Sequence, residues 1–133
     1  MESIFKFRSR AKQLIDFSGL QWGSITPTDI DGLIEYKNKA MVFMEFKHDG
    51  AQMPKGQELA LQRLADDSQK VGKEATVLEC VHYVSNCDND VTAADAIVRR
   101  LYYKGKWYND GKTTVKGKIN SFISYVENPF RKI

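Results

Sequence analysis

The chain has 133 residues, 42% hydrophobic and 28% charged, with a formal net charge of +3. This length fits one domain with its own core, and the mild basic excess permits a phosphate-bearing partner without requiring one. The two cysteines, Cys80 and Cys87, are too few for a disulfide framework and form no Cys-x-x-Cys zinc pair. No segment is apolar enough to span a membrane, so we expect a cytoplasmic protein without a membrane partner.

Apolar residues recur at helical spacing from 4 to 17, which predicts a first helix. Two apolar runs, at 30–36 and 41–46, flank the polar residues 37–39. This pattern predicts a β-hairpin with a tight turn. The second run is apolar on both faces until its last residues, so we expect its strand to be central in the sheet.

The second half of the chain begins with helical periodicity over about 57–71, followed by Gly72 as a C-terminal cap. Residues 75–84 are rich in β-branched side chains and predict a third strand. Aromatic residues flank a Lys-Gly-Lys turn within 102–112, which favours a hairpin or a structured loop. An apolar stripe predicts a last helix over about 114–126.

Between these elements, Thr92 and Asp95 are spaced as in a capping box. Apolar residues from 97 to 101 follow it, so we expect a helix there. Arg99 and Arg100 would then belong to its solvated face. The order of elements predicts a single α/β domain over 1–133, with a mixed central sheet flanked by helices.

Two carboxylates and a lysine stand out in the predicted hairpin. Glu45 and Lys47 lie two residues apart on a strand, so their side chains point to the same face. With a three-residue turn, Asp31 faces Glu45 on that face, whereas a two-residue turn would put Asp31 on the opposite face. Asp29 has the same strand parity as Asp31 and is the alternative acid.

Such a group is unfavourable without a partner, because opposed carboxylates repel each other and a buried unpaired charge is costly. A divalent cation relieves both costs, and Mg²⁺ takes one or two carboxylates together with waters and a substrate phosphate. The ion polarises the phosphate and activates a bound water, while a lysine beside it offsets developing charge. The pattern therefore indicates a site for a divalent cation, Mg²⁺ or Mn²⁺, that is suited to a phosphate; the alternative is a structural charge cluster at a sheet edge.

A resemblance to a known family supports the first interpretation. Residues 27–32, Pro-Thr-Asp-Ile-Asp-Gly, followed after one hairpin by Glu45-Phe46-Lys47, resemble the signature of the PD-(D/E)XK nuclease superfamily. The expected elements over about 4–84 are similar to its restriction-endonuclease-like αβββαβ core, with residues 88–133 as an elaboration carrying extra C-terminal helices. Small replication-repair nucleases and Holliday-junction resolvases are the most similar branches.

The resemblance implies roles for particular residues. Asp31 or Asp29 and Glu45 would be metal ligands, with the backbone carbonyl of Phe46 as a third, and Lys47 would act on the attacking water. Gln57 resembles a helix glutamine of several branches and joins the expected catalytic set. The glutamate that the family carries on its first helix has no clear counterpart here. Weaker candidates for nucleic-acid contact are His48, Lys104, Lys106, Trp107 and Lys112.

The sequence thus predicts a Mg²⁺-dependent DNA endonuclease or end-processing nuclease. We expect a structure-specific role in replication, repair or recombination, in a phage or mobile element, as a homodimer or within a larger nucleic-acid-processing assembly. The alternatives are a non-catalytic nucleic-acid-binding module on the same fold, or a protein-interaction domain whose apolar stripe at 119–126 docks a partner helix.

Overall fold

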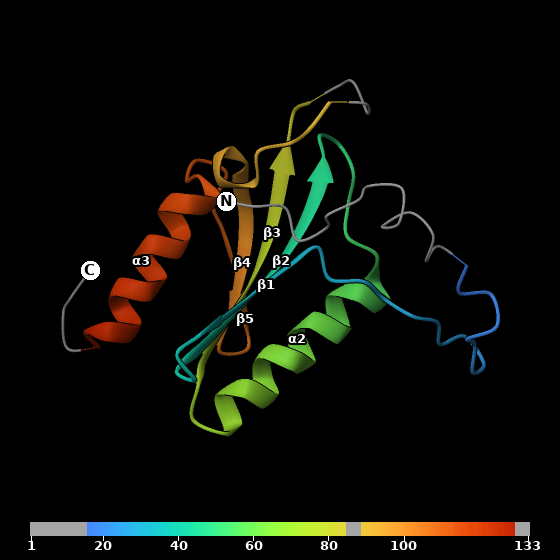
Figure 1. Cartoon of the computed structure of the whole chain (residues 1–133), viewed down its shortest axis with the longest axis horizontal. Helices are drawn as coiled ribbons and strands as arrows, with labels where there is room; N and C mark the ends of the chain where they lie inside the picture. Colours follow the sequence, from blue (N-terminus) through green and yellow to red (C-terminus); the bar gives the residue numbers. More distant parts are fainter. Residues whose placement is uncertain (1–15, 85–88, 130–133) are drawn as a thin grey trace.

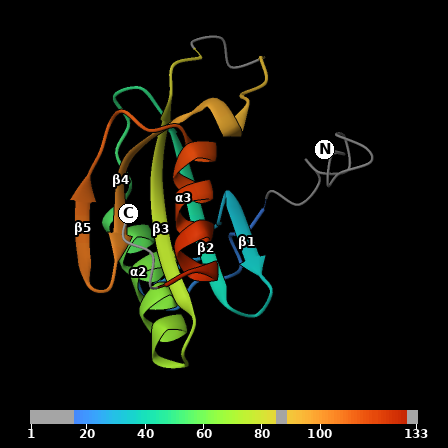
Figure 2. The same cartoon turned by 90° about the vertical axis from the view of Figure 1, so that its left-hand side faces the viewer.

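The computed structural model describes residues 16–84 and 89–129. In this part of the chain one mixed sheet, ordered β1-β2-β3-β4-β5, carries a long helix on each face (Figure 1 and Figure 2). The strands are β1 (Gly32–Tyr36), β2 (Ala40–His48), β3 (Glu74–His82), β4 (Ile97–Tyr103) and β5 (Lys106–Asn109). The helices are α2 (Lys55–Lys70) and α3 (Val115–Glu127), and a 3-10 turn, η1 (Ala93–Asp95), precedes β4. The expected α/β class is confirmed.

The β1–β2 hairpin has the three-residue turn that the sequence favoured. Tyr36 pairs with Ala40, and the Lys39 N–H donates to the Tyr36 carbonyl at 2.8 Å. Lys37 and Asn38 take positive φ angles of 49° and 59°, a left-handed conformation that asparagine tolerates well. The turn therefore sets the register that directs the start of β1 toward the end of β2.

A β2–α2–β3 unit forms the centre of the molecule. Strands β2 and β3 are parallel neighbours, and α2 crosses between them to cover one face of the sheet. Leu61 and Ala65 of α2 pack there on Phe43 and Val77 in a buried cluster. The helix and the third strand expected from the sequence are confirmed, with bounds shifted by one or two residues.

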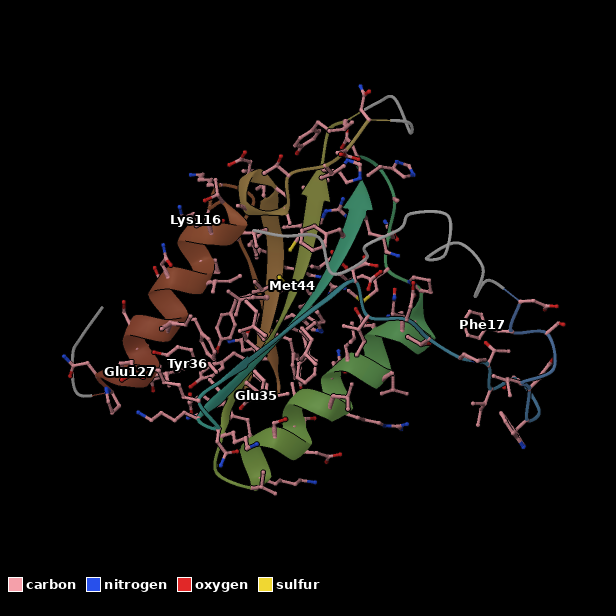
Figure 3. All side chains as sticks on the ribbon, in the orientation of Figure 1. Phe17, Glu35, Tyr36, Met44, Lys116 and Glu127 are labelled. Atoms are coloured by element: carbon pink, nitrogen blue, oxygen red, sulfur yellow. The ribbon has the colours of Figure 1, made fainter. Side chains whose placement is uncertain are left out.

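Helix α3 covers the opposite face, as Figure 2 shows with α3 in front of the sheet and α2 behind it. Val115 of α3 packs against Leu78 and Val98, which point away from α2. At its other end α3 is tied to the hairpin turn. Tyr36 hydrogen-bonds the Glu127 carboxylate, which lies 3.5 Å from Lys39 Nζ, and Figure 3 shows Tyr36 beside Glu127. The last predicted helix is thus confirmed.

The helix expected after Thr92 is wrong. The structure has only one 3-10 turn there, without a side-chain cap from Thr92 in the described chain, and residues 97–103 form β4. β4 pairs with the free edge of β3, where backbone N–H and C=O groups need hydrogen-bond partners. This pairing overrides the local helical spacing. The C-terminal elaboration is therefore a β4–β5 hairpin and one helix, not extra helices alone.

The nuclease-like core is matched only in part. Residues 16–54 contain two named strands and an isolated bridge between Trp22 and Ile25, rather than the three strands of an αβββαβ core. The expected first helix at 4–17 lies almost wholly outside the described residues. Among the described helices, none is long and apolar enough to cross a membrane.

Candidate active site

The carboxyl groups of Asp31 and Glu45 meet on the sheet face that α2 covers. Gly32 pairs with Met44, so Asp31, one residue earlier, faces Glu45 as the sequence predicted. The Asp31 carboxyl is close enough to Glu45 to raise its pKa, and Asp31 Oδ2 accepts the Phe46 N–H at 2.7 Å. The side chain of Asp31, the residue just before β1, therefore extends the hydrogen-bond ladder by one step, and this bond fixes Asp31 beside Glu45.

Glu45 is buried, with 2% of its surface exposed. Its Oε1 atom lies 3.2 Å from Lys47 Nζ, and the Lys47 side chain keeps 21% exposure. Its Oε2 atom is buried without a hydrogen-bond partner in residues 16–84 and 89–129. Lys47 thus pairs with one oxygen of the buried carboxylate and also reaches solvent. The other carboxylate oxygen is left for a further ligand.

The pKa of Glu45 is raised from 4.5 to about 7. Burial is the main cause, because it disfavours the charged carboxylate; the hydrogen bond and the negative charge of Asp31 add to it, and Lys47 opposes it. The pair therefore holds more negative charge than its surroundings compensate. A cation placed between the two carboxylates would reverse this balance.

Gln57 lies in the first turn of α2 and is also buried. Its Nε2 donates to the backbone carbonyl of Asp29 at 3.3 Å, and its Oε1 has no hydrogen-bond partner among the described residues. Gln57 thus anchors the segment before β1 to α2. Of the two alternative acids, the structure brings the Asp31 carboxyl to Glu45, whereas Asp29 contacts Gln57 through its backbone.

The chemistry of this donor set fits a hard divalent cation. Two carboxylates converge, one oxygen is buried without a described partner, and oxygen ligands are those that Mg²⁺ prefers. In an antiparallel ladder the N–H and C=O of one residue point to the same neighbour. Because the Phe46 N–H points to Asp31, its carbonyl is directed to that side too. Within the described residues, no three His, Cys, Asp or Glu side chains form a metal-binding group, so described ligands beyond the pair would be backbone carbonyls or neutral side-chain oxygens.

A second charged group lies beside this pair and was missed by sequence reasoning. Glu79 is the register partner of Glu45 on β3 and is also buried. Arg100 Nε and Nη2 donate to its two oxygens at 3.2 and 3.1 Å, and Arg100 Nη2 also donates to Glu58 of α2. Arg99 Nη1 lies 3.7 Å from Glu79 Oε2. The expectation that Arg99 and Arg100 occupy a solvated helix face is therefore wrong.

A β-bulge explains how two successive arginines reach the same face. The register shifts between Glu79 and Cys80, so that Arg100 pairs with Glu79 and Val98 with Cys80. Arg99 is the additional residue, and both guanidinium groups turn toward α2. The available signal was Glu79 itself, because an acid inside an apolar strand needs a cationic partner.

The weaker candidates for nucleic-acid contact do not gather at one place. His48 is exposed at the end of β2, near the acid pair, and Lys112 is exposed beyond β5. Lys104 and Lys106 lie at the β4–β5 turn, and Lys104 Nζ is 3.8 Å from Glu74 at the start of β3. Half-buried Trp107 packs on Tyr102 and Arg100, and its ring therefore belongs to the α2 side of the core.

Two other acid-x-Lys patterns in the sequence serve turns. Glu35 Oε2 accepts the Asn38 N–H at 2.8 Å in the β1–β2 turn, where Lys37 is exposed. Asp110 Oδ1 accepts the N–H groups of Lys112 and Thr113 at 2.8 and 2.9 Å. Only the pattern at 45–47 combines a buried acid with a second carboxylate.

Comparison of the chain with protein-family models, with curated proteins and with solved structures gives no match. The interpretation of the site therefore depends on its residues and geometry.

Proposed function

We propose that this chain is a divalent-metal-dependent nuclease that hydrolyses phosphodiester bonds in DNA. One observation carries the proposal: Glu45 Oε2 is buried without a partner among the described residues, beside the Asp31 carboxyl and at the same end of β2 as Lys47. A buried carboxylate that faces a second carboxyl group, and that a single lysine compensates only in part, is a site for a cation. A lysine beside a cation is suited to a phosphate substrate.

The residues would divide the work as follows. Asp31, Glu45 and the Phe46 carbonyl would hold Mg²⁺ or Mn²⁺. When bound, the ion supplies a polarised phosphate and a water of lowered pKa. Lys47, partly open to solvent, would orient that water and offset negative charge on the phosphate. Gln57 would keep the segment that carries Asp31 against α2.

The PD-(D/E)XK nucleases are the family whose signature these residues resemble, and we propose membership on the acid pair, the lysine and the register between them. DNA is the proposed substrate, with a structure-specific role in replication, repair or recombination. The basic excess of the chain supports a phosphate-bearing partner.

The first experiment is a cleavage assay. Labelled single-stranded, duplex, flap and junction DNA would be incubated with the protein in Mg²⁺, in Mn²⁺ and in EDTA. We expect cleavage only with metal, and a loss of at least about 100-fold in Lys47→Ala and in Asp31→Asn. Lys37→Ala is the matched control, because Lys37 occupies the same position of an acid-x-Lys pattern but is exposed at a turn.

The controls decide between the alternatives. Lys37→Ala should cleave as the unchanged protein does, and all variants should give the same circular dichroism spectrum. No cleavage under any condition, together with DNA binding that is equal in Mg²⁺ and EDTA, would overturn the catalytic proposal. The non-catalytic nucleic-acid-binding module would then be the better description.

A further inference from the structure

A hollow of about 340 Å³ opens on the α2 side of the sheet, one strand away from the acid pair. Its lining includes Lys55, Glu58, Glu79, Arg99, Arg100 and Asn109. Glu79 of this lining is the register partner of Glu45, and neighbouring strands lie about 4.8 Å apart. The hollow therefore adjoins the proposed catalytic centre and lies between the start of α2 and strands β3 and β4.

The two arginines of the hollow differ in how fully the protein already pairs their positive charges. Arg100 is committed to the protein, since its Nε and Nη2 donate to Glu79 and Glu58 while its guanidinium lies 3.8 Å over the Trp107 ring. Arg99 is held by one strong contact, from its Nη1 to the Ala51 carbonyl at 2.8 Å. Its distance of 3.7 Å to Glu79 leaves its charge only loosely matched.

Lys55 adds a third cation at the rim. Its side chain is 96% exposed, and its Nζ lies 3.7 Å from Glu58 Oε2. Lys55 is also the first residue of α2, where the helix dipole is positive and Pro54 has no side-chain acceptor for the free N–H groups. Three cationic side chains thus stand against two carboxylates around the hollow, and this excess of positive charge favours an anion.

We propose that this hollow binds a phosphate of the DNA strand, one nucleotide step from the phosphate processed at Asp31 and Glu45. The assignment of that neighbouring phosphate rests on the proposed function. Arg99 and Lys55 are its cationic ligands. Arg100 offsets part of the negative charge of Glu79 and Glu58, and Arg99 and Lys55 leave the lining with an excess of positive charge for the strand.

This placement gives the substrate strand a path. The strand passes from the end of β2, over the start of α2, toward β4, and the acid pair and the hollow lie along one direction across the sheet. It also explains the bulge in β4, which turns Arg99 onto the same face as Glu79. Phosphate contacts of this kind position a substrate without reading its sequence.

The test measures DNA binding without metal, so that it does not depend on catalysis. A labelled oligothymidylate and a short duplex would be titrated in EDTA from about 50 to 200 mM salt, where each lost phosphate contact lowers the salt slope by about 0.7 for a single strand and about 0.9 for a duplex. We expect Arg99→Gln and Lys55→Gln each to weaken binding several-fold and to lower the slope by about that amount. Lys70→Gln is the matched control, an exposed lysine at the other end of the same helix.

The outcomes separate this proposal from the nuclease assignment. Unchanged affinity and slope in both Arg99→Gln and Lys55→Gln would overturn the phosphate site, even if the protein cleaves DNA. Loss of binding in those variants, in a protein that cleaves no substrate, would support the site and contradict the nuclease. Lys55→Gln cannot act through unfolding, because its side chain is almost fully exposed. An equal loss in Lys70→Gln would reduce the effect to net charge and would also overturn the site.

Discussion

Glu45 and Glu79 occupy equivalent positions on neighbouring strands but have opposite surroundings. They are register partners on β2 and β3, face the same helix and are both almost fully buried. Glu79 receives two hydrogen bonds from Arg100. Glu45 instead faces the Asp31 carboxyl, and one of its oxygens lacks a partner in the described chain.

The two acids differ in whether the fold itself supplies the compensating charge. A buried carboxylate with a bidentate arginine is stabilised in the fold as it stands. A buried carboxylate that lies beside a second carboxyl group, and that a partly exposed lysine compensates only in part, is destabilising until a further cation is added. Both acids follow apolar residues in strands, so their sequence contexts are similar, and only the partner separates them.

The largest effect is expected from Arg100→Ala, which removes the partner of Glu79. The substitution leaves a buried carboxylate uncompensated, and breaking a buried pair in this way costs about 3–5 kcal/mol. Urea unfolding followed by circular dichroism would measure this loss. Arg63→Ala, at an exposed position of α2, should change the unfolding free energy by less than about 0.5 kcal/mol. A small effect of Arg100→Ala would show that Glu79 does not need its arginine.

The same substitution at the two glutamates should have opposite signs. Glu45→Gln removes a carboxylate that is disfavoured first by its burial and then by Asp31, and since one pKa unit corresponds to about 1.4 kcal/mol, we expect a metal-free stabilisation on the order of 2 kcal/mol at about pH 8. Glu79→Gln should destabilise, because Arg100 loses its charged partner. Thermal unfolding of both variants in EDTA makes the comparison. Destabilisation by both would mean that Glu45 is a satisfied structural acid.

The pH dependence of stability is the next test of the acid pair. The pKa of Glu45 in the folded protein, about 7, lies above its ordinary value of 4.5, so the folded state binds the extra proton between these values. Metal-free stability should therefore be highest below about pH 4.5 as far as Glu45 contributes, and should fall as the pH rises through about 7. Glu45→Gln should lack this fall, and Mg²⁺ should reduce it in the unchanged protein. An equal fall in Glu45→Gln would assign the titration to other groups.

The sequence alone predicts the structure correctly where the local pattern and the tertiary structure agree. The turn at 37–39 sets the register by itself, and the alternation of β2 then determines that Glu45 and Lys47 share a face. At β4 the sequence alone predicts the wrong element, because a capping-box spacing and apolar residues at 97–101 resemble a helix. The bulge also hides the two-residue period of the strand, so the sequence does not indicate that both arginines face α2. Pairing with β3 decides that region, and such long-range pairing cannot be obtained from local spacing.

The smallest effect on stability is expected at Gln57, an uncharged residue that holds the segment before β1 against α2. Its Nε2 bond to the Asp29 carbonyl is long, at 3.3 Å, and its Oε1 is buried without a partner among residues 16–84 and 89–129. Gln57→Leu removes both groups with a side chain of similar shape, so the change in unfolding free energy should stay below about 1 kcal/mol. Cleavage should nevertheless fall about tenfold, because the segment leading to Asp31 is no longer held on α2 and the acid pair loses its alignment. Parallel melting and cleavage measurements would separate the two quantities. Unchanged cleavage would show that the Asp31–Phe46 bond alone positions the pair, and a matching loss of stability would make Gln57 a packing residue of the core.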